Sequence, residues 1–435
     1  MGNVKLKRLK IAKYRNVAPG TELIFNDGFN VLLGQNGTGK TTLLKLIAMV
    51  TASRFGSLKE VEFSLGYTLG FPGARVDVAI ENKRNDSEAP LDEPFSWSYR
   101  VVLEVDELPH PWTLLATTKE RLLYPADMQE EVGAKGPTVN PFERNLLSSS
   151  LLLIADFLNN KEQGHHDVSA LFRFMTFEIQ NITNGRRFDE LLGGLDSITG
   201  AIGSSDAPSA SFQFVRPTNG VLPRERDRST FIPKQLEPMM KAHDPSSRSL
   251  DGIRAKHEDV AFLAEAVRLM GFKGADMLLR LRRREPVEAG ERLTFCDFEF
   301  TITLDDETII PHSALSYGQK RLLAFLYYVA ANDDVIIADE IVNGMHYDWI
   351  EACLREIGGR QSFLTSQNPL LLDFLPFTTE QDVEHTFILC GNEQRDGRRH
   401  MAWKNMSEES AQTFFRSYKT QALQVSEILR SRGWW

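Results

Sequence analysis

The stretch Gly34-Gln35-Asn36-Gly37-Thr38-Gly39-Lys40-Thr41 has the pattern G-x-x-x-x-G-K-[ST] of a phosphate-binding loop. The apolar run 31–33 precedes it, and an apolar stretch with helical character follows over 42–50. The order strand, glycine loop, helix is the context that this motif requires. Its glycines let backbone N–H groups curl around a polyphosphate, and the positive end of the helix dipole faces that charge. We therefore expect the chain to bind a nucleoside triphosphate.

Two residues of this loop have specific chemical roles. Lys40 can reach the β- and γ-phosphates, and the hydroxyl group of Thr41 can bind Mg²⁺. We accordingly expect Mg²⁺ to bind together with the nucleotide, with Lys40 as a catalytic residue and Thr41 as a metal ligand. The residues expected to bind the nucleotide are Gly34, Asn36, Gly37, Thr38, Gly39, Lys40, Thr41 and Thr42.

A second group of motifs lies far downstream. Residues 315–321 read Leu-Ser-Tyr-Gly-Gln-Lys-Arg, and an apolar run with helical character follows over 322–331. A buried-type strand, 335–338, then ends in Asp339 and Glu340. Such a strand delivers its terminal carboxylates to the edge of a sheet where ligands bind in α/β folds. Asp339 would bind Mg²⁺ directly or through water, and Glu340 would orient or deprotonate the attacking water.

Each of these pieces also has a purely structural interpretation. An apolar run ending in Asp-Glu can be a strand that meets a turn, and Ser-x-Gly-Gln can be an ordinary helix cap with a turn glycine. The order of the pieces, downstream of a complete phosphate loop, favours the functional interpretation.

Composition restricts the class of protein. The 435 residues are 42% hydrophobic and 25% charged, with a net charge of −9, which is typical of a globular chain and argues against a uniformly DNA-coating protein. No run of 18 apolar residues and no signal peptide is found, so we expect no membrane association. The three cysteines have no metal-binding spacing, and a reducing cytoplasm is the simplest location.

Two basic clusters are local exceptions to the negative net charge. Both can be merely solvated surface, the first as a strand edge and the second as a helix end. They leave nucleic-acid binding open. The first cluster consists of Lys5, Lys7, Arg8, Lys10, Lys13 and Arg15, and the second of Arg280, Arg282, Arg283 and Arg284.

The chain divides into three predicted segments. Residues 1–120 form the N-terminal half of the nucleotide site, with strands over 1–33, 61–69, 74–80 and 97–105. Residues 121–285 form a helical and flexible insert, with helices over 146–158, 168–182 and 258–270 and a Gly-, Ser-, Pro- and Arg-rich part over 193–257. Residues 286–435 form the C-terminal half, which begins with a strand over 292–304.

These motifs resemble a known family. Residues 315–321 resemble the L-S-G-G-Q signature of ABC-type ATPases, with Tyr317 in place of a glycine. Residues 340–346, Glu-Ile-Val-Asn-Gly-Met-His, resemble the D-loop of the soluble RecF/SMC-like and OLD-like branch, and the stretches 14–16, 28–31 and 425–434 are also similar to members of that branch. The resemblance covers about 1–120 and 286–435. It implies an α/β fold, a P-loop NTPase head of the ABC type with a mixed sheet and flanking helices, interrupted by a mainly helical insert.

The resemblance also implies a head-to-tail dimer. Ser316, Gly318 and Gln319 of one subunit would complete the site around ATP that Lys40 of the other subunit holds. A homodimer or higher homo-oligomer is therefore expected.

One further position departs from the family pattern. Members of the branch often have a switch histidine where this chain has Gln367. An amide can form a hydrogen bond to water or phosphate but cannot carry a proton, so we expect a slow ATPase in which Gln367 takes this catalytic position. Gln129 is the candidate for the glutamine loop of the family.

Three functions follow from the resemblance. The first is an ATP-driven sensor or regulator that controls a separate effector protein, as in phage defence. The second is a RecF/SMC-like ATPase of DNA repair or chromosome maintenance, although the heptad arms of SMC-type proteins are absent. The third, a transporter's nucleotide-binding subunit, is disfavoured by the strand-rich opening. No nuclease motif is found, so we expect ATP hydrolysis to be the only catalysis.

Overall fold

The computed structural model describes residues 4–85, 94–106, 110–125, 139–160, 212–217, 233–236, 238–239, 252–287, 290–332 and 335–434. The chain forms two compact units, and each unit is assembled from separate segments. The first unit consists of Met1–Gly185, Gly359–Thr365 and Leu375–Trp435, and the second of Arg186–Gly358 and Ser366–Phe374. This division differs from the three segments expected from the sequence, which stay a prediction.

The first unit contains an antiparallel sheet with the strand order β2-β1-β4-β5-β6-β7-β8. Buried apolar and exposed polar residues alternate along β5, as expected for a sheet with one face in the core. The strands predicted over 61–69, 74–80 and 97–105 are confirmed. The sheet consists of β1 (Lys5–Tyr14), β2 (Thr21–Ile24), β4 (Phe63–Phe71), β5 (Ala74–Arg84), β6 (Phe95–Val105), β7 (Trp112–Thr117) and β8 (Arg121–Pro125).

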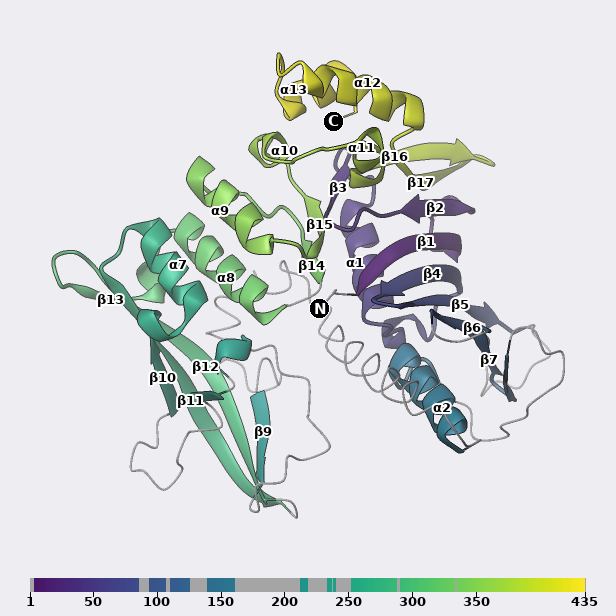
Figure 1. The fold of residues 1–435 in the computed structure, drawn as a ribbon, viewed down its shortest axis with the longest axis horizontal. Helices are drawn as coiled ribbons and strands as arrows, with labels where there is room; N and C mark the ends of the chain where they lie inside the picture. Colours follow the sequence, from purple (N-terminus) through teal and green to yellow (C-terminus); the bar gives the residue numbers. More distant parts are fainter. Residues whose placement is uncertain are drawn as a thin grey trace. The chain divides into compact units, whose positions relative to one another are not determined.

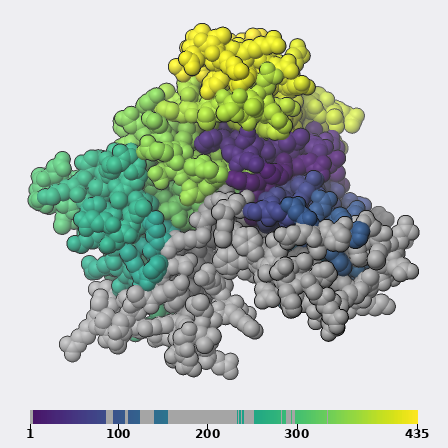
Figure 2. Space-filling model, viewed as in Figure 1, coloured from purple at the N-terminus to yellow at the C-terminus, as the bar shows by residue number. Residues whose placement is uncertain are grey.

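A parallel arrangement surrounds the strand that precedes the glycine loop. This strand, β3 (Phe29–Leu33), is buried and lies between β15 (Gln361–Thr365) and β16 (Phe387–Arg395), parallel to both. β16 in turn pairs antiparallel with β17 (Arg398–Asn405). In Figure 2 the N-terminal residues, in purple, lie directly against the yellow-green C-terminal part of the same unit. Segments from opposite ends of the chain therefore build the core around β3.

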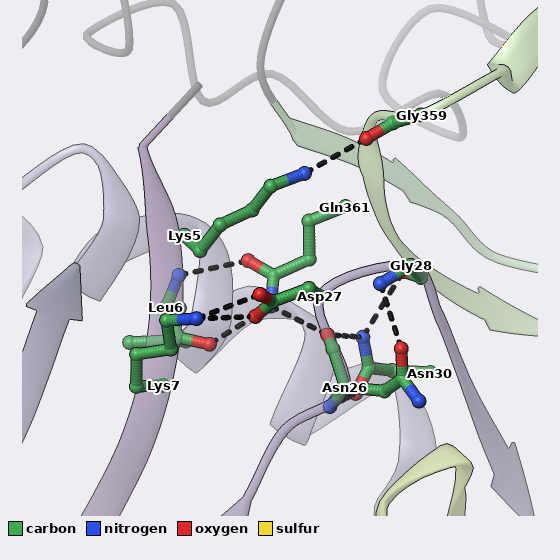
Figure 3. Close-up of polar contacts among 9 residues, drawn as sticks. All are labelled: Lys5, Leu6, Lys7, Asn26, Asp27, Gly28, Asn30, Gly359 and Gln361. Atoms are coloured by element: carbon green, nitrogen blue, oxygen red, sulfur yellow. Dashed lines mark hydrogen bonds and ion pairs between the residues drawn. The ribbon is translucent and has the colours of Figure 1, made fainter. Parts of the chain in front are cut away.

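A buried glutamine, Gln361, joins the two sheets of this unit (Figure 3). Its amide accepts from the backbone N–H of Leu6 on β1 and donates to the backbone oxygen of the same residue, both at 2.8 Å. The amide also donates to the backbone oxygen of Asn26, at 2.8 Å. Asn30, also fully buried, accepts from the backbone N–H of Asn26 at 2.8 Å and so closes the turn before β3. These bonds satisfy polar groups that would be costly to bury unpaired.

Helices flank both sheets of the first unit (Figure 1). The helix predicted over 146–158 is confirmed as α2 (Leu146–Asn160). Asn145, the residue before this helix, donates from its side chain to the backbone oxygen of Ala52 at 2.7 Å. The other α-helices in the described part of this unit are α1 (Lys40–Thr51), α11 (Glu380–Thr386), α12 (Glu408–Lys419) and α13 (Val425–Ser431).

The second unit has its own sheet, in the order β10-β11-β12-β13, with β9 paired to β12. Aromatic rings fill the core beside it, where Tyr327 packs edge-on against Phe262 and Phe298. The elements are β9 (Phe212–Pro217), β10 (Gly252–Lys256), α7 (Ala261–Met270), β11 (Gly274–Val287), β12 (Gly290–Thr303), β13 (Ile309–Pro311), α8 (Tyr317–Ala331), β14 (Val335–Ala338), α9 (Tyr347–Ile357) and α10 (Leu370–Asp373).

Four predictions in the second unit can be compared directly with the structure. The strands over 292–304 and 335–338 are confirmed as β12 and β14. The helix predicted over 258–270 is confirmed as α7, which Gly271 ends in a left-handed conformation with φ +68°. The second basic cluster, interpreted as a helix end, is instead part of strand β11. The interpretation was wrong because arginines alternate with Leu279 and Leu281 at the two-residue period of a strand.

The predicted insert, 121–285, is only partly described. Its described part contains strands β8, β9, β10 and β11 as well as helices α2 and α7. The predicted helix over 168–182 and Gln129 lie outside the described residues. None of the helices that the structure describes is both long and apolar enough to cross a membrane. The fold is α/β, with mixed sheets, flanking helices and a glycine loop between β3 and α1, as predicted.

Candidate nucleotide site

The glycine loop joins β3 directly to α1, as the sequence predicts. Gly34 has φ +146°, and a Cβ atom there would lie 2.1 Å from the backbone oxygen of Cys390 on β16. Gly37 and Gly39 have φ +80° and +85°, in the left-handed region that favours glycine. Only glycine therefore lets the loop follow this path against its neighbouring strand.

The side chain of Lys40 folds back over the loop. Its Nζ donates to the backbone oxygens of Gly34 at 2.6 Å and of Gln35 at 3.1 Å. Thr38, which is buried, donates to the same Gln35 oxygen at 2.7 Å and tightens the turn. Asn36, Gly37 and Thr41 are exposed, whereas Thr42 is half-buried. The ammonium group is thus placed at the loop, where it can neutralise a bound phosphate.

The start of α1 is electrostatically suited to an anion. Its N-cap residue is Gly39, which has no side chain to cap the helix, and its first turn contains no acidic residue. The first backbone N–H groups of a helix carry a partial positive charge that side-chain caps normally satisfy. A polyphosphate can take the place of such a cap.

A tryptophan that the sequence did not identify supports the loop from β17. The indole Nε1 of Trp403 donates to the backbone oxygen of Thr38 at 3.0 Å, and the Trp403 side chain is buried. Met401 of the same strand would lie 2.2 Å from a Cβ atom at Gly39. The only sequence signal was the alternation of apolar residues at 401 and 403, which is typical of any buried strand.

In the second unit, Asp339 and Glu340 directly follow the buried strand β14. Both side chains are half-buried. Gln367 donates from its Nε2 to Oε1 of Glu340, and Asn343 donates from its Nδ2 to Oε2 at 2.6 Å. The structure thus brings together Glu340 and Gln367, the two residues that the sequence proposed for hydrolysis. Asn343 was part of the quoted motif, but no role was predicted for it.

The signature residues begin helix α8. Ser316 is the N-cap, and its Oγ accepts from the backbone N–H of Gln319 at 3.3 Å. The Gln319 side chain accepts in return from the backbone N–H of Ser316 at 2.9 Å. Gly318 is buried, and a Cβ atom there would lie 2.3 Å from the backbone oxygen of Gly344. The structural interpretation of Ser-x-Gly-Gln as a helix cap is therefore correct, and it leaves Ser316 exposed for a further role.

Each of the two expected metal ligands carries an oxygen of a type that Mg²⁺ accepts. Thr41 offers a hydroxyl oxygen from the first unit, and Asp339 offers a carboxylate from the second. Mg²⁺ prefers such oxygen ligands and usually completes its octahedron with water and substrate phosphates. Groups of three or more His, Cys, Asp or Glu side chains arranged for a metal are not found among the described residues.

Comparisons with known proteins give one family match and several weak structural likenesses. Residues 8–105 match the model of a family described as an AAA domain. No curated protein matches the sequence. The solved structures that match include the SMC head domain from Thermotoga maritima, with 11% identity, a TM-score of 0.34 and coverage of 93% of this chain and 99% of that chain.

Two further structures give a similar result. The Smc head domain with an extended coiled coil from Pyrococcus furiosus is 11% identical, with a TM-score of 0.35 and coverage of 96% of this chain and 100% of that chain. The recombination mediator protein RecF is 14% identical, with a TM-score of 0.28 and coverage of 93% and 99%. Likenesses this weak do not assign a function to the chain.

Proposed function

We propose that this chain is an ATPase that binds ATP with Mg²⁺ at the glycine loop and hydrolyses it slowly through Glu340. The observation that carries the proposal is the start of α1, where an uncapped helix emerges from the loop beside the ammonium group of Lys40. The match of residues 8–105 to an AAA domain supports the same assignment.

Each residue has a defined chemical task in this proposal. Lys40 binds the β- and γ-phosphates, and Thr41 and Asp339 are the residues that would hold Mg²⁺. When bound, Mg²⁺ supplies positive charge against the phosphate oxygens. Glu340 accepts a proton from the attacking water, because its carboxylate is held by Asn343 and Gln367. Gln367 can orient Glu340 but cannot itself transfer a proton.

We further propose that the active form is a homodimer or a higher homo-oligomer. Ser316, Gly318 and Gln319 of one copy would contribute to the ATP site of another. Ser316 supports this proposal because it stays exposed at the N-terminus of α8 while its helix is already capped. The exposed Ser316 hydroxyl accepts a hydrogen bond within the cap, and its O–H group can donate to a γ-phosphate.

The proposed biological role is regulatory. ATP binding would favour a closed oligomer, and a separate effector protein would recognise that state. Phage defence is one setting in which such a regulator would act. The support is that the predicted chemistry of the chain ends at ATP, so any further output requires another protein.

The primary test compares nucleotide binding and hydrolysis in three variants. Lys40→Ala should lose ATP binding by calorimetry, because it removes the charge beside the phosphates. Glu340→Gln should bind ATP normally but lower kcat by about 10²-fold or more, because the amide cannot accept a proton. Lys45→Ala is the matched control, since Lys45 is exposed on the same helix. Parental turnover in Glu340→Gln would refute the assignment of the base.

A mixing experiment tests the shared site. Lys40→Ala and Ser316→Ala proteins, each inactive or impaired alone, should regain part of the activity when mixed. A mixed dimer would carry one site that lacks both residues and one that is intact. Complete inactivity of a mixture in which mixed dimers are demonstrated by mass spectrometry would refute the shared site.

The alternative function, a RecF/SMC-like ATPase of DNA maintenance, uses the same nucleotide chemistry. The run of arginines on β11 favours it, because Arg280 and Arg283 are exposed on a long antiparallel ribbon. Both are engaged by carboxylates, Arg280 with Glu299 at 2.7 Å and Arg283 with Glu285 at 2.6 Å. Strong, salt-sensitive stimulation of ATP hydrolysis by duplex DNA, lost in Arg280→Ala with Arg283→Ala, would favour this alternative.

A further inference from the structure

Arg321 is a buried cation in the second unit, one turn into helix α8, and only 5% of its surface is exposed. Its Nε donates to the backbone oxygen of Ile341 at 3.1 Å, and its Nη2 donates to the backbone oxygen of Glu340. Its Nη1 donates to the hydroxyl oxygen of Tyr317 at 3.1 Å. A buried guanidinium is costly unless oxygens satisfy its donors, and here two adjacent carbonyl groups and a phenol do so.

The two carbonyl groups belong to the turn that carries Glu340. This residue has φ +50°, in the left-handed region that non-glycine residues rarely adopt. Such a conformation persists only where surrounding contacts hold it, and it is concentrated at functional sites. The backbone N–H of Asn343 donates to the same Glu340 oxygen at 3.3 Å. Arg321 is thus part of the frame that keeps the backbone of Glu340 in this conformation.

The carboxylate of Glu340 is held separately, by Asn343 and Gln367. Glu340 is therefore fixed at both ends, with Arg321 on its backbone and two amides on its side chain. A rotation of the backbone would swing the carboxylate away from these amides. The position of the proposed base consequently depends on a residue that does not contact the carboxylate.

The third contact of Arg321 reaches the signature segment. Tyr317 is 65% exposed, and its ring lies against Gly344, where an added Cβ atom would lie 2.9 Å from the ring. The hydroxyl group that accepts from Arg321 is thus on a surface residue at the start of α8. A binding partner that contacts Tyr317 can therefore affect the Glu340 turn through the side chain of Arg321.

We propose that Arg321 is a positioning residue for hydrolysis, which holds the Glu340 backbone and links it to the signature segment through the Tyr317 hydroxyl. The inference rests on the proposed ATPase function. It predicts that Arg321 acts on kcat and leaves ATP binding in the first unit unchanged.

A double-mutant cycle tests this role. Arg321→Met should lower kcat about tenfold or more, because a displaced catalytic group loses alignment, while the Kd for ATP stays within about twofold. In a Glu340→Gln background the same substitution should cause no further loss, because the two residues act as one unit. Arg321→Lys should recover part of kcat. Arg355→Met is the matched control, since Arg355 is an exposed arginine of α9 paired with Glu265 at 3.2 Å.

Tyr317→Phe provides a second variant that keeps the fold, because it removes only the hydroxyl group of an exposed residue. It should lower kcat several-fold with a small fall in Tm, because Nη1 of Arg321 loses one acceptor. Parental kcat in Arg321→Met, or independent losses in the double mutant, would overturn the positioning role. Parental kcat in Tyr317→Phe would overturn the link to the signature. A parent that binds ATP without hydrolysing it would instead refute the proposed ATPase itself.

Discussion

Trp403 and Thr38 are joined by a buried hydrogen bond of 3.0 Å, although they lie 365 positions apart in the sequence. The bond ties the glycine loop to β17, so the loop is supported by a strand near the end of the chain. The indole contacts the backbone of the loop and leaves its exposed residues available to a ligand. Trp403 therefore shapes the phosphate site without being part of its surface.

Replacing Trp403 by Phe should weaken both the fold and nucleotide binding. The substitution leaves the buried oxygen of Thr38 without its donor, which typically costs about 1–3 kcal/mol of unfolding free energy. The loop would also lose its fixed shape, so we expect ATP affinity to fall several-fold by calorimetry. Trp97→Phe, on β6, is the control. Parental affinity and stability in Trp403→Phe would show that the bond has no role.

Two loop glycines should respond differently to alanine. Both Gly34 and Gly37 have positive φ, but only Gly34 faces a backbone oxygen, at 2.1 Å from an added Cβ atom. Gly37 has nothing within 4 Å. We expect Gly34→Ala to abolish ATP binding and to lower Tm, and Gly37→Ala to cost only about 1–2 kcal/mol of backbone strain. Equal effects in calorimetry and thermal unfolding would contradict the packing explanation.

Two glycines outside the loop, Gly318 and Gly359, differ in how closely the surrounding atoms pack against them. A Cβ atom at Gly318 would lie 2.3 Å from the backbone oxygen of Gly344, whereas Gly359 has open space around it. Gly318→Ala should therefore lower the unfolding free energy by about 1–3 kcal/mol, as overpacking does, and also slow hydrolysis. Gly359→Ala should change neither quantity. Urea unfolding and a steady-state ATPase assay measure both.

Gln367→His should raise ATP turnover. Gln367 already contacts the carboxylate of Glu340, so a histidine placed there can exchange a proton with it, which the amide cannot. The expected result is a several-fold increase in kcat with an acidic limb near the pKa of histidine. A parent with fast turnover, or a slower histidine variant, would argue against a restraining role for Gln367.

Cys390, next to the loop on β16, should be unreactive in the folded protein. Burial raises its pKa to about 12, so its thiol stays protonated at pH 8. Iodoacetamide should label it at pH 8 only in denaturant, as peptide mapping would show. Because the pKa is raised in the folded state, the thiol stabilises the fold below its unfolded pKa of about 8.5. That contribution is lost as the pH rises from about 8.5 towards 12.

The sequence predicted those parts of the site that depend on neighbouring residues. The glycine loop with its flanking strand and helix, the strand ending at Asp339, and the cap at Ser316 each occupy one continuous segment. The rules that apply to them are local ones of dihedral angle, period and capping. The resemblance specified the positions of Glu340 and Gln367, but it did not predict the hydrogen bond between them.

Other features depend on contacts between distant segments, which a single sequence does not specify. Nothing around Trp403 indicated that its indole would reach the loop, and Arg321 has the appearance of a solvated residue in a helix. The prediction of a helix end for the arginines on β11 was wrong because charged residues alone do not distinguish the two-residue period of a strand from the period of a helix. Parallel pairing of β3 with β15 and β16 has no local signal at all.

The dependence of the loop on β16 and β17 has a consequence for biosynthesis. A ribosome makes the glycine loop early, but Trp403 leaves the exit tunnel only after several hundred further residues have been added. Until β15 and β16 have also emerged, β3 lacks its parallel neighbours, and the nascent chain must keep this apolar strand from aggregating. We therefore expect nucleotide binding to be a late event in translation, and we expect a chain truncated before β16 to bind ATP more weakly than the full chain.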